Sequence, residues 1–174
     1  MKMYILYIFS DIPYNKVELI KKGGPPMSLR FNYQKENPEA LQTMLKLEGF
    51  NAKSGLDKKL YELIKIRASQ INGCAYCVDM HTKDLGKMGE SQERMHLISV
   101  WREANDIFSD KEKAILELTE AVTHISHGGV PQDLYEKVLT YFSEKEYIDI
   151  IMAINTINCW NRIAISTGMY PGCF

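Results

Sequence analysis

Cysteine, histidine and net charge are all scarce in this chain. Its 174 residues include four cysteines and four histidines, and 21 basic side chains stand against 22 acidic ones. A net charge of -1 offers no attraction for a polyanion, so nucleic-acid binding is not expected. So few cysteines in a chain of this length do not form the disulfide framework of a small secreted domain. We therefore expect a protein of the reducing cytoplasm.

Long hydrophobic runs are also lacking. The most apolar stretch near the N-terminus, Tyr4–Phe9, spans only six residues and is followed by Asp11 and Pro13. That length is too short for the core of a signal peptide or for a membrane span, and no small-residue cleavage pattern follows it. Neither secretion nor membrane insertion is expected.

The first 26 residues differ in character from the remainder. Lys21–Gly24 reads Lys-Lys-Gly-Gly, whose codons are compatible with a purine-rich ribosome-binding sequence ahead of a start at Met27. We expect residues 1–26 to be an extension outside the native chain and residues 27–174 to form one helical domain. The alternative is a genuine, loosely attached N-terminal arm.

Strand patterns are scarce after Met27, whereas apolar residues recur at spacings of three and four. With 45% hydrophobic residues the chain can bury one sizeable core. The fold class predicted is an all-α single-domain bundle of about seven helices with short connections. The predicted helices lie near residues 38–51, 56–72, 74–89, 91–101, 109–125, 131–142 and 143–165.

The last predicted helix is apolar over much of its circumference, with isoleucine at seven positions between 148 and 165. Such a helix must be covered on several sides. Either it is the central helix of the bundle or part of it lies between subunits. A homo-oligomer is the expected outcome.

Two of the four cysteines form a Cys-x-x-Cys pair, Cys74 and Cys77, at the expected start of a helix. Two thiols at this spacing can close a short disulfide, and the free amides of a first helical turn lower the pKa of a thiol placed there. His81 follows Cys77 by four residues, which places the imidazole one turn away on the same face. The stretch therefore predicts redox chemistry with a proton acceptor nearby.

A base of this kind is usually oriented by a carboxylate, and Glu62 is the candidate. It precedes Cys74 by twelve residues, which in one straight helix would separate them by roughly 18 Å. The Asn72-Gly73 pair is a typical helix stop, and a fold-back there would bring Glu62 towards His81. We expect a long side chain or one water molecule to bridge the remaining gap.

The constellation of Glu62, Cys74-x-x-Cys77 and His81 resembles the core motif of the alkyl hydroperoxidase D-like members of the carboxymuconolactone decarboxylase family. Residues 63–81 are similar to that family nearly residue for residue. Residues 101–103, Trp-Arg-Glu, and residues 157–162 resemble it as well. The likeness covers about residues 38–172.

This resemblance implies an all-helical fold that assembles into trimers or hexamers, and peroxide reduction by a dithiol without a metal or bound cofactor. By that likeness Cys77 attacks the peroxide and becomes a sulfenic acid, and Cys74 resolves it to a disulfide. His81 would take the thiol proton, and Glu62 would orient and buffer the imidazole.

The partners implied are a small peroxide substrate and an external dithiol donor, such as a lipoylated adaptor protein. The best-known relatives also reduce a peroxiredoxin, and they carry a histidine inside the Cys-x-x-Cys. This chain has Tyr76 there, a departure that weakens the expectation of a peroxiredoxin partner.

Other functions remain open from the residues alone. A decarboxylase acting on a lactone acid, as in the other branch of the family, does not need Cys74 and Cys77, so their presence argues against it. A zinc site of Cys74, Cys77 and His81 lacks the usual second pair of ligands. A redox sensor whose disulfide alters assembly would need the same two thiols.

The remaining cysteines and histidines are expected to have structural positions. Cys159 lies in the apolar last helix and is interpreted as a packed small hydrophobic residue. Cys173, next to the C-terminus, is expected to be exposed. His124 and His127 flank a helix end before two glycines, where imidazoles commonly cap carbonyl groups.

Overall fold

The computed structural model describes residues 28–174, and this part of the chain folds into helices without strands. The all-α prediction is confirmed. The predicted extension, residues 1–26, lies outside the described residues. Two 3-10 helices, η2 (Ile98–Val100) and η3 (Ile125–His127), accompany eight α-helices in the described part. The α-helices are α1 (Tyr33–Glu36), α2 (Pro38–Lys53), α3 (Lys58–Asn72), α4 (Ala75–Lys87), α5 (Gln92–Leu97), α6 (Asp110–Thr123), α7 (Gln132–Leu139) and α8 (Glu144–Thr167).

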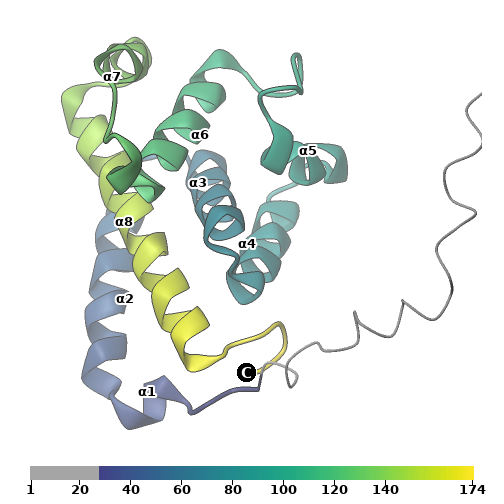
Figure 1. Cartoon of the computed structure of the whole chain (residues 1–174), viewed down its shortest axis with the longest axis vertical. Helices are drawn as coiled ribbons and strands as arrows, with labels where there is room; N and C mark the ends of the chain where they lie inside the picture. Colours follow the sequence, from purple (N-terminus) through teal and green to yellow (C-terminus); the bar gives the residue numbers. More distant parts are fainter. Residues whose placement is uncertain (1–27) are drawn as a thin grey trace, which may run out of the picture.

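Helix α3 lies at the centre of the bundle (Figure 1), where α4, α6 and α8 pack against it. Its side chains Leu63, Ile64 and Ala68 are completely buried. Helix α2 runs beside α8. Because the burial of apolar surface is the main stabilising contribution, α3 is the element to which the other helices are fixed.

Local sequence signals set the helix ends. Ser109 with Glu112, and Ser143 with Glu146, form capping boxes in which side chain and backbone bond reciprocally at the starts of α6 and α8. Gly73 ends α3 in the left-handed conformation, with φ of 71°. These predicted boundaries are confirmed.

The structure differs from the sequence-based expectation in two places. The four-residue helix α1 was not expected; the Asn32 side chain caps it by accepting from two backbone amides. The predicted helix over residues 91–101 is instead α5 followed by η2. The β-branched residues of η2 fit an α-helix poorly, and the tighter turn buries Ile98 while the Trp101 indole donates to Glu120 at 2.8 Å.

Helix α8 is covered on several sides by α2, α3, α4, α6 and α7, as predicted, and a stripe along it is exposed. Its inner face, including Ile150 and Ile154, is buried, but Ile148 is 57% exposed and Cys159 is also exposed. The interpretation of Cys159 as a packed residue was therefore wrong, because its position in the helical register faces away from the bundle. Cys173 is half-buried rather than exposed.

The described helices do not include one that is both long enough and apolar enough to cross a membrane.

Gly168 ends α8 in the left-handed conformation, with φ of 74°, and a Cβ added there would lie 2.5 Å from the Ser28 carbonyl oxygen. We expect Gly168→Ala to lower the free energy of unfolding by at least about 2 kcal/mol, since backbone strain adds to a collision with main-chain atoms. Urea unfolding measures this.

Gly129 provides the matched control, because its φ is 71° and an added Cβ meets nothing within 4 Å. Gly129→Ala should cost only the strain of the left-handed conformation, about 1 kcal/mol. Equal losses in the two variants would contradict the close approach at Gly168.

Candidate functional site

The connection between α3 and α4 creates the site. Gly73 turns the chain out of α3, and the Cys74 amide donates back to the Ser69 carbonyl at 2.9 Å. Helix α4 therefore starts immediately after α3 ends and folds back against it. Cys74 becomes the residue that caps the first turn of α4.

The two thiols of this turn are in contact. Cys74 Sγ and Cys77 Sγ are 2.6 Å apart, both cysteines are 2% exposed, and both are free thiols. The Cys77 backbone amide also points at Cys74 Sγ, at 3.4 Å. This is the short spacing that a Cys-x-x-Cys pair needs in order to exchange between dithiol and disulfide.

The environment shifts the pKa values of the two thiols in opposite directions. The hydrogen bond from the Cys77 thiol lowers the pKa of Cys74 to about 7; burial opposes this effect, and the Cys77 amide and the Asn161 side chain add to it. The pKa of Cys77 is raised, because its proton is held by Cys74 and because it is buried. The first ionisation of the pair therefore leaves its charge mainly on Cys74.

A network of hydrogen bonds joins α8 to the end of α3 next to the dithiol. Asn161 donates to Ser69 Oγ at 2.9 Å and accepts from Asn72 Nδ2 at 2.9 Å, while Asn72 also donates to Asn158 Oδ1 at 2.9 Å. Asn161 is completely buried. These bonds fix the end of α3 to α8 at the point where the chain turns into α4.

Glu62 and His81 meet directly across the α3–α4 contact. Glu62 Oε2 lies 2.9 Å from His81 Nδ1, and both residues are 5% exposed. The predicted approach is confirmed, and it needs neither a long reach nor a bridging water because α4 returns close along α3. The pair has the geometry of a base and its orienting carboxylate.

Lys65 holds the other oxygen of the same carboxylate, with Nζ 3.0 Å from Glu62 Oε1. Burial alone would raise the pKa of Glu62, but the hydrogen bonds and charges of His81 and Lys65 outweigh it and hold this pKa below its usual value. Glu62 is therefore a carboxylate at neutral pH.

A pocket of about 310 Å³ opens onto Cys77 and His81. Cys77 lines it and Cys74 does not, so the second sulfur is the one that a pocket ligand meets. The wall is mainly aromatic and aliphatic, and it comes from both ends of the described chain as well as from α3 and α4. The lining residues are Tyr33, Gln34, Leu41, Leu45, Glu48, Lys65, Tyr76, Cys77, Met80, His81, Trp160, Ala164 and Met169.

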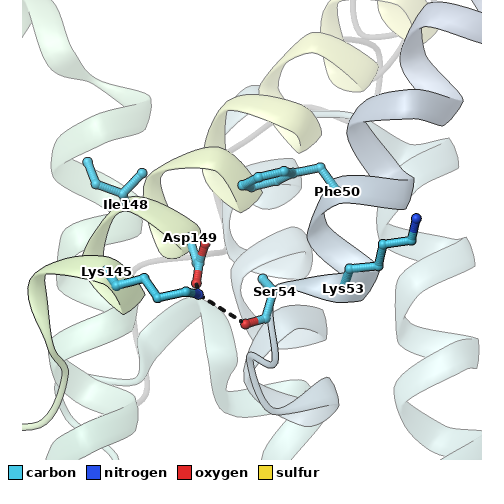
Figure 2. A pocket seen from close by; sticks show the side chains of 6 residues that line it. All are labelled: Phe50, Lys53, Ser54, Lys145, Ile148 and Asp149. Carbon is cyan, nitrogen blue, oxygen red and sulfur yellow. Dashed lines mark hydrogen bonds and ion pairs between the residues drawn. The ribbon is translucent and has the colours of Figure 1, made fainter.

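A second hollow of about 500 Å³ lies between the end of α2 and the start of α8. Figure 2 shows its lining, in which the exposed Phe50 and Ile148 flank the ion pair of Lys145 with Asp149, whose atoms are 2.7 Å apart. Its six lining residues include neither cysteine nor histidine. Despite its greater volume it lacks the chemistry of the dithiol pocket.

The grouping of possible metal ligands differs from the zinc alternative. Among the described residues, the donors close enough to share an ion are Glu62, His81 and Asp84, and this group contains neither thiol. Glu62 and His81 already bond to one another, and Asp84 pairs with Lys87 at 2.8 Å. The proposed Cys-Cys-His ligand set does not assemble.

The structure joins Cys74 to Cys77 and Glu62 to His81, and it places Cys77 and His81 in the lining of one pocket. It also adds residues that the sequence reasoning missed. Lys65 follows Glu62 by three residues, a spacing that signals contact on a helix. Glu48 and Asn161 come from distant helices, so spacing carried no signal for them. Trp160 and Tyr76 line the pocket.

Comparison with known proteins shows which family this chain resembles. A sequence model of the carboxymuconolactone decarboxylase family matches residues 38–121. The uncharacterized protein YdfG of Bacillus subtilis is 44% identical over 142 residues, which cover 82% of this chain and 96% of that protein. Alkyl hydroperoxide reductase AhpD of Coxiella burnetii is 42% identical over 50 residues, 28% of each chain.

Solved structures show a similar fold. ATU0492 of Agrobacterium tumefaciens, a protein of unknown function, superposes with a TM-score of 0.80 at 43% identity, covering 83% of this chain and 99% of that one. The debrominase Bmp8 superposes with a TM-score of 0.70 at 18% identity, over 80% and 75% of the two chains. The latter likeness concerns the fold alone.

The thiol contact generates a prediction about reactivity. Cys77→Ala removes the donor that lowers the pKa of Cys74 to about 7, so the pH midpoint of Cys74 alkylation should rise by about one unit or more, towards that of a free thiol. Iodoacetamide rates are measured against pH in a background where Cys159 and Cys173 are serine. They report Cys74 alone in the Cys77 variants, and mass spectrometry assigns the alkylated site in the protein that retains both thiols.

Cys77→Ser is the matched control, since its hydroxyl can still donate to Cys74 and the midpoint should rise less. An unchanged midpoint in Cys77→Ala would show that the contact between the sulfurs does not set the acidity of Cys74.

Proposed function

This chain is an alkyl hydroperoxidase D-like member of the carboxymuconolactone decarboxylase family, and on that premise we propose that it is a thiol-dependent peroxidase. The proposed reaction reduces a small hydroperoxide through a dithiol–disulfide cycle of Cys74 and Cys77. One observation carries the proposal: Cys77 of the free dithiol and His81 line the same pocket. His81 is bonded there to the buried carboxylate of Glu62.

The first step forms a sulfur–oxygen bond. His81 accepts one proton from the thiol pair, and the Cys77 thiolate attacks the terminal oxygen of the hydroperoxide. The oxygen–oxygen bond breaks, and the leaving alkoxide takes the proton from His81 to become an alcohol. Cys77 is left as a sulfenic acid, oxidised by two electrons.

The second step closes the disulfide. The Cys74 sulfur attacks Cys77 Sγ, the sulfenic hydroxyl leaves with the Cys74 proton as water, and the two sulfurs are joined. An external dithiol then reduces the disulfide by thiol exchange and returns both cysteines to the thiol form. A reducing compartment, as expected for this chain, supplies such donors.

The roles of the two sulfurs follow from access and acidity together. Cys77 lines the pocket, which favours it as the attacking atom. The lower pKa belongs to Cys74, so attack by Cys77 requires the shared proton to move to Cys74 across their 2.6 Å contact. Cys74 then holds the proton that the second step releases as water.

The proposal includes a homo-oligomer, with trimers or hexamers implied by the family likeness. Its support is the outer side of α8, where Ile148 and Ile165 are exposed although both are large and apolar. Such side chains favour contact with another subunit.

Turnover of cumene hydroperoxide with dihydrolipoamide as the external dithiol tests the proposed function. We expect Cys77→Ser and Cys74→Ser each to lower kcat/KM by at least about 100-fold, since each removes one of the two sulfurs that the cycle needs.

Cys159→Ser is the matched control, because this thiol is exposed and lies outside the pocket lining, and its activity should equal that of the unaltered protein. Full turnover by Cys77→Ser would dismiss the mechanism.

A further inference from the structure

Lys65 is a buried cation beside the relay that the proposed mechanism does not use. It lies one turn after Glu62 on α3 and is only 7% exposed. Its Nζ is 3.0 Å from Glu62 Oε1 and 3.8 Å above the centre of the Tyr61 ring. An ammonium group is costly to bury unless anions compensate it, so its place in the pocket wall depends on these partners.

A second carboxylate lies on the far side of Lys65. Glu48 Oε2, on α2, is 4.0 Å from Lys65 Nζ. Glu48 is itself fixed by neutral donors, since the Tyr61 hydroxyl donates to Oε2 and the Trp160 indole donates to Oε1, each at 2.8 Å. Three helices thus hold Lys65 between two carboxylates, and Lys65 and Glu48 both line the pocket with His81.

The contacts of Glu62 determine where the proton of His81 sits. An ammonium only donates, so Glu62 Oε1 accepts from Lys65, and the ionised carboxylate must also accept at Oε2. His81 Nδ1 is therefore the nitrogen that carries hydrogen. In a neutral imidazole the other nitrogen, Nε2, is then a free base.

The charge of Lys65 opposes the charge of Glu62, which acts directly on that imidazole. With Lys65, which lies closer to Glu62 than to Glu48, much of the charge of Glu62 is compensated, and His81 is not the only group that can compensate this buried anion. Without the ammonium, the lone carboxylate would hold a proton on His81, which could then no longer accept one from the thiols.

We propose that Lys65 is a positioning residue that keeps His81 available as a base by neutralising Glu62, and that Glu48 holds Lys65 in place. This inference rests on the proposed function only in assigning His81 the role of proton acceptor. Other titratable groups surround the imidazole as well, and the comparison between variants must leave them unchanged. They are Glu62 of α3, Cys77 and Asp84 of α4, Glu48 of α2, and the pocket tyrosines Tyr33 and Tyr76.

The test is the titration of the His81 ring, followed by NMR in the full chain and identified by its absence in His81→Gln. Lys65→Gln keeps a donor for Glu62 but removes the charge, so the midpoint pH of the His81 titration should rise by about one unit. Lys65→Arg keeps the charge and should restore the original midpoint. The acid limb of the peroxidase pH profile should move with it.

Lys83→Gln is the matched control, since Lys83 is an exposed lysine of α4 whose partner is Asp79, and it should leave the midpoint unchanged. Circular dichroism establishes that each variant is folded, and Lys65→Met provides the same comparison if Lys65→Gln does not fold. An unshifted midpoint in a folded variant lacking the charge, or an equal shift in Lys65→Arg, overturns the inference.

The titration does not depend on turnover, so the two proposals fail separately. A protein inactive towards peroxides whose His81 midpoint rises in Lys65→Gln supports the role of Lys65 and overturns the peroxidase. An active peroxidase whose His81 midpoint stays in place in Lys65→Gln supports the proposed function and overturns the role of Lys65.

Discussion

The contact between Glu62 and His81 is the constraint around which this fold is arranged. It joins α3 to α4 by a 2.9 Å bond between two side chains that are almost fully buried. Removing one partner of a buried hydrogen bond typically costs about 1–3 kcal/mol, because the other group is left unsatisfied. The two helices must therefore stay packed closely, and the glycine bend at Gly73 makes that packing possible. The same bend leaves Cys74 at the start of a helix, so structure and reactivity share one cause.

In the dithiol, one sulfur has access to the pocket and the other is the more acidic. Cys77 faces the pocket, whereas Cys74 is the more acidic sulfur because it receives hydrogen bonds from the Cys77 thiol and backbone amide. One proton shared over 2.6 Å serves both needs, since either sulfur can carry the charge while the other keeps the hydrogen. The buried amide of Asn161 steadies the arrangement from α8.

Local patterns in the sequence predicted much of this structure. The capping boxes at Ser109 and Ser143, the stop at Gly73 and the meeting of Glu62 with His81 all depend on residues near one another in sequence or on one bend. The pocket walls could not be predicted, because Glu48 and Trp160 come from helices more than a hundred residues apart. The exposure of side chains within α8 could not be predicted either. The helix is apolar over much of its circumference, so its composition could not tell which side, including Cys159, faces outward.

The α8 contribution to the site has a consequence for biosynthesis. Trp160, Ala164 and Met169 line the pocket, and Asn161 helps to lower the pKa of Cys74, yet all four follow the two cysteines by more than eighty residues. A nascent polypeptide that has already formed α3 and α4 carries both cysteines but lacks these neighbours. Its Cys74 then lacks the hydrogen bond of Asn161, although the Cys77 thiol and backbone amide still lower the pKa of Cys74. The pocket that Cys77 lines is therefore complete only after α8 has packed against α3 and α4.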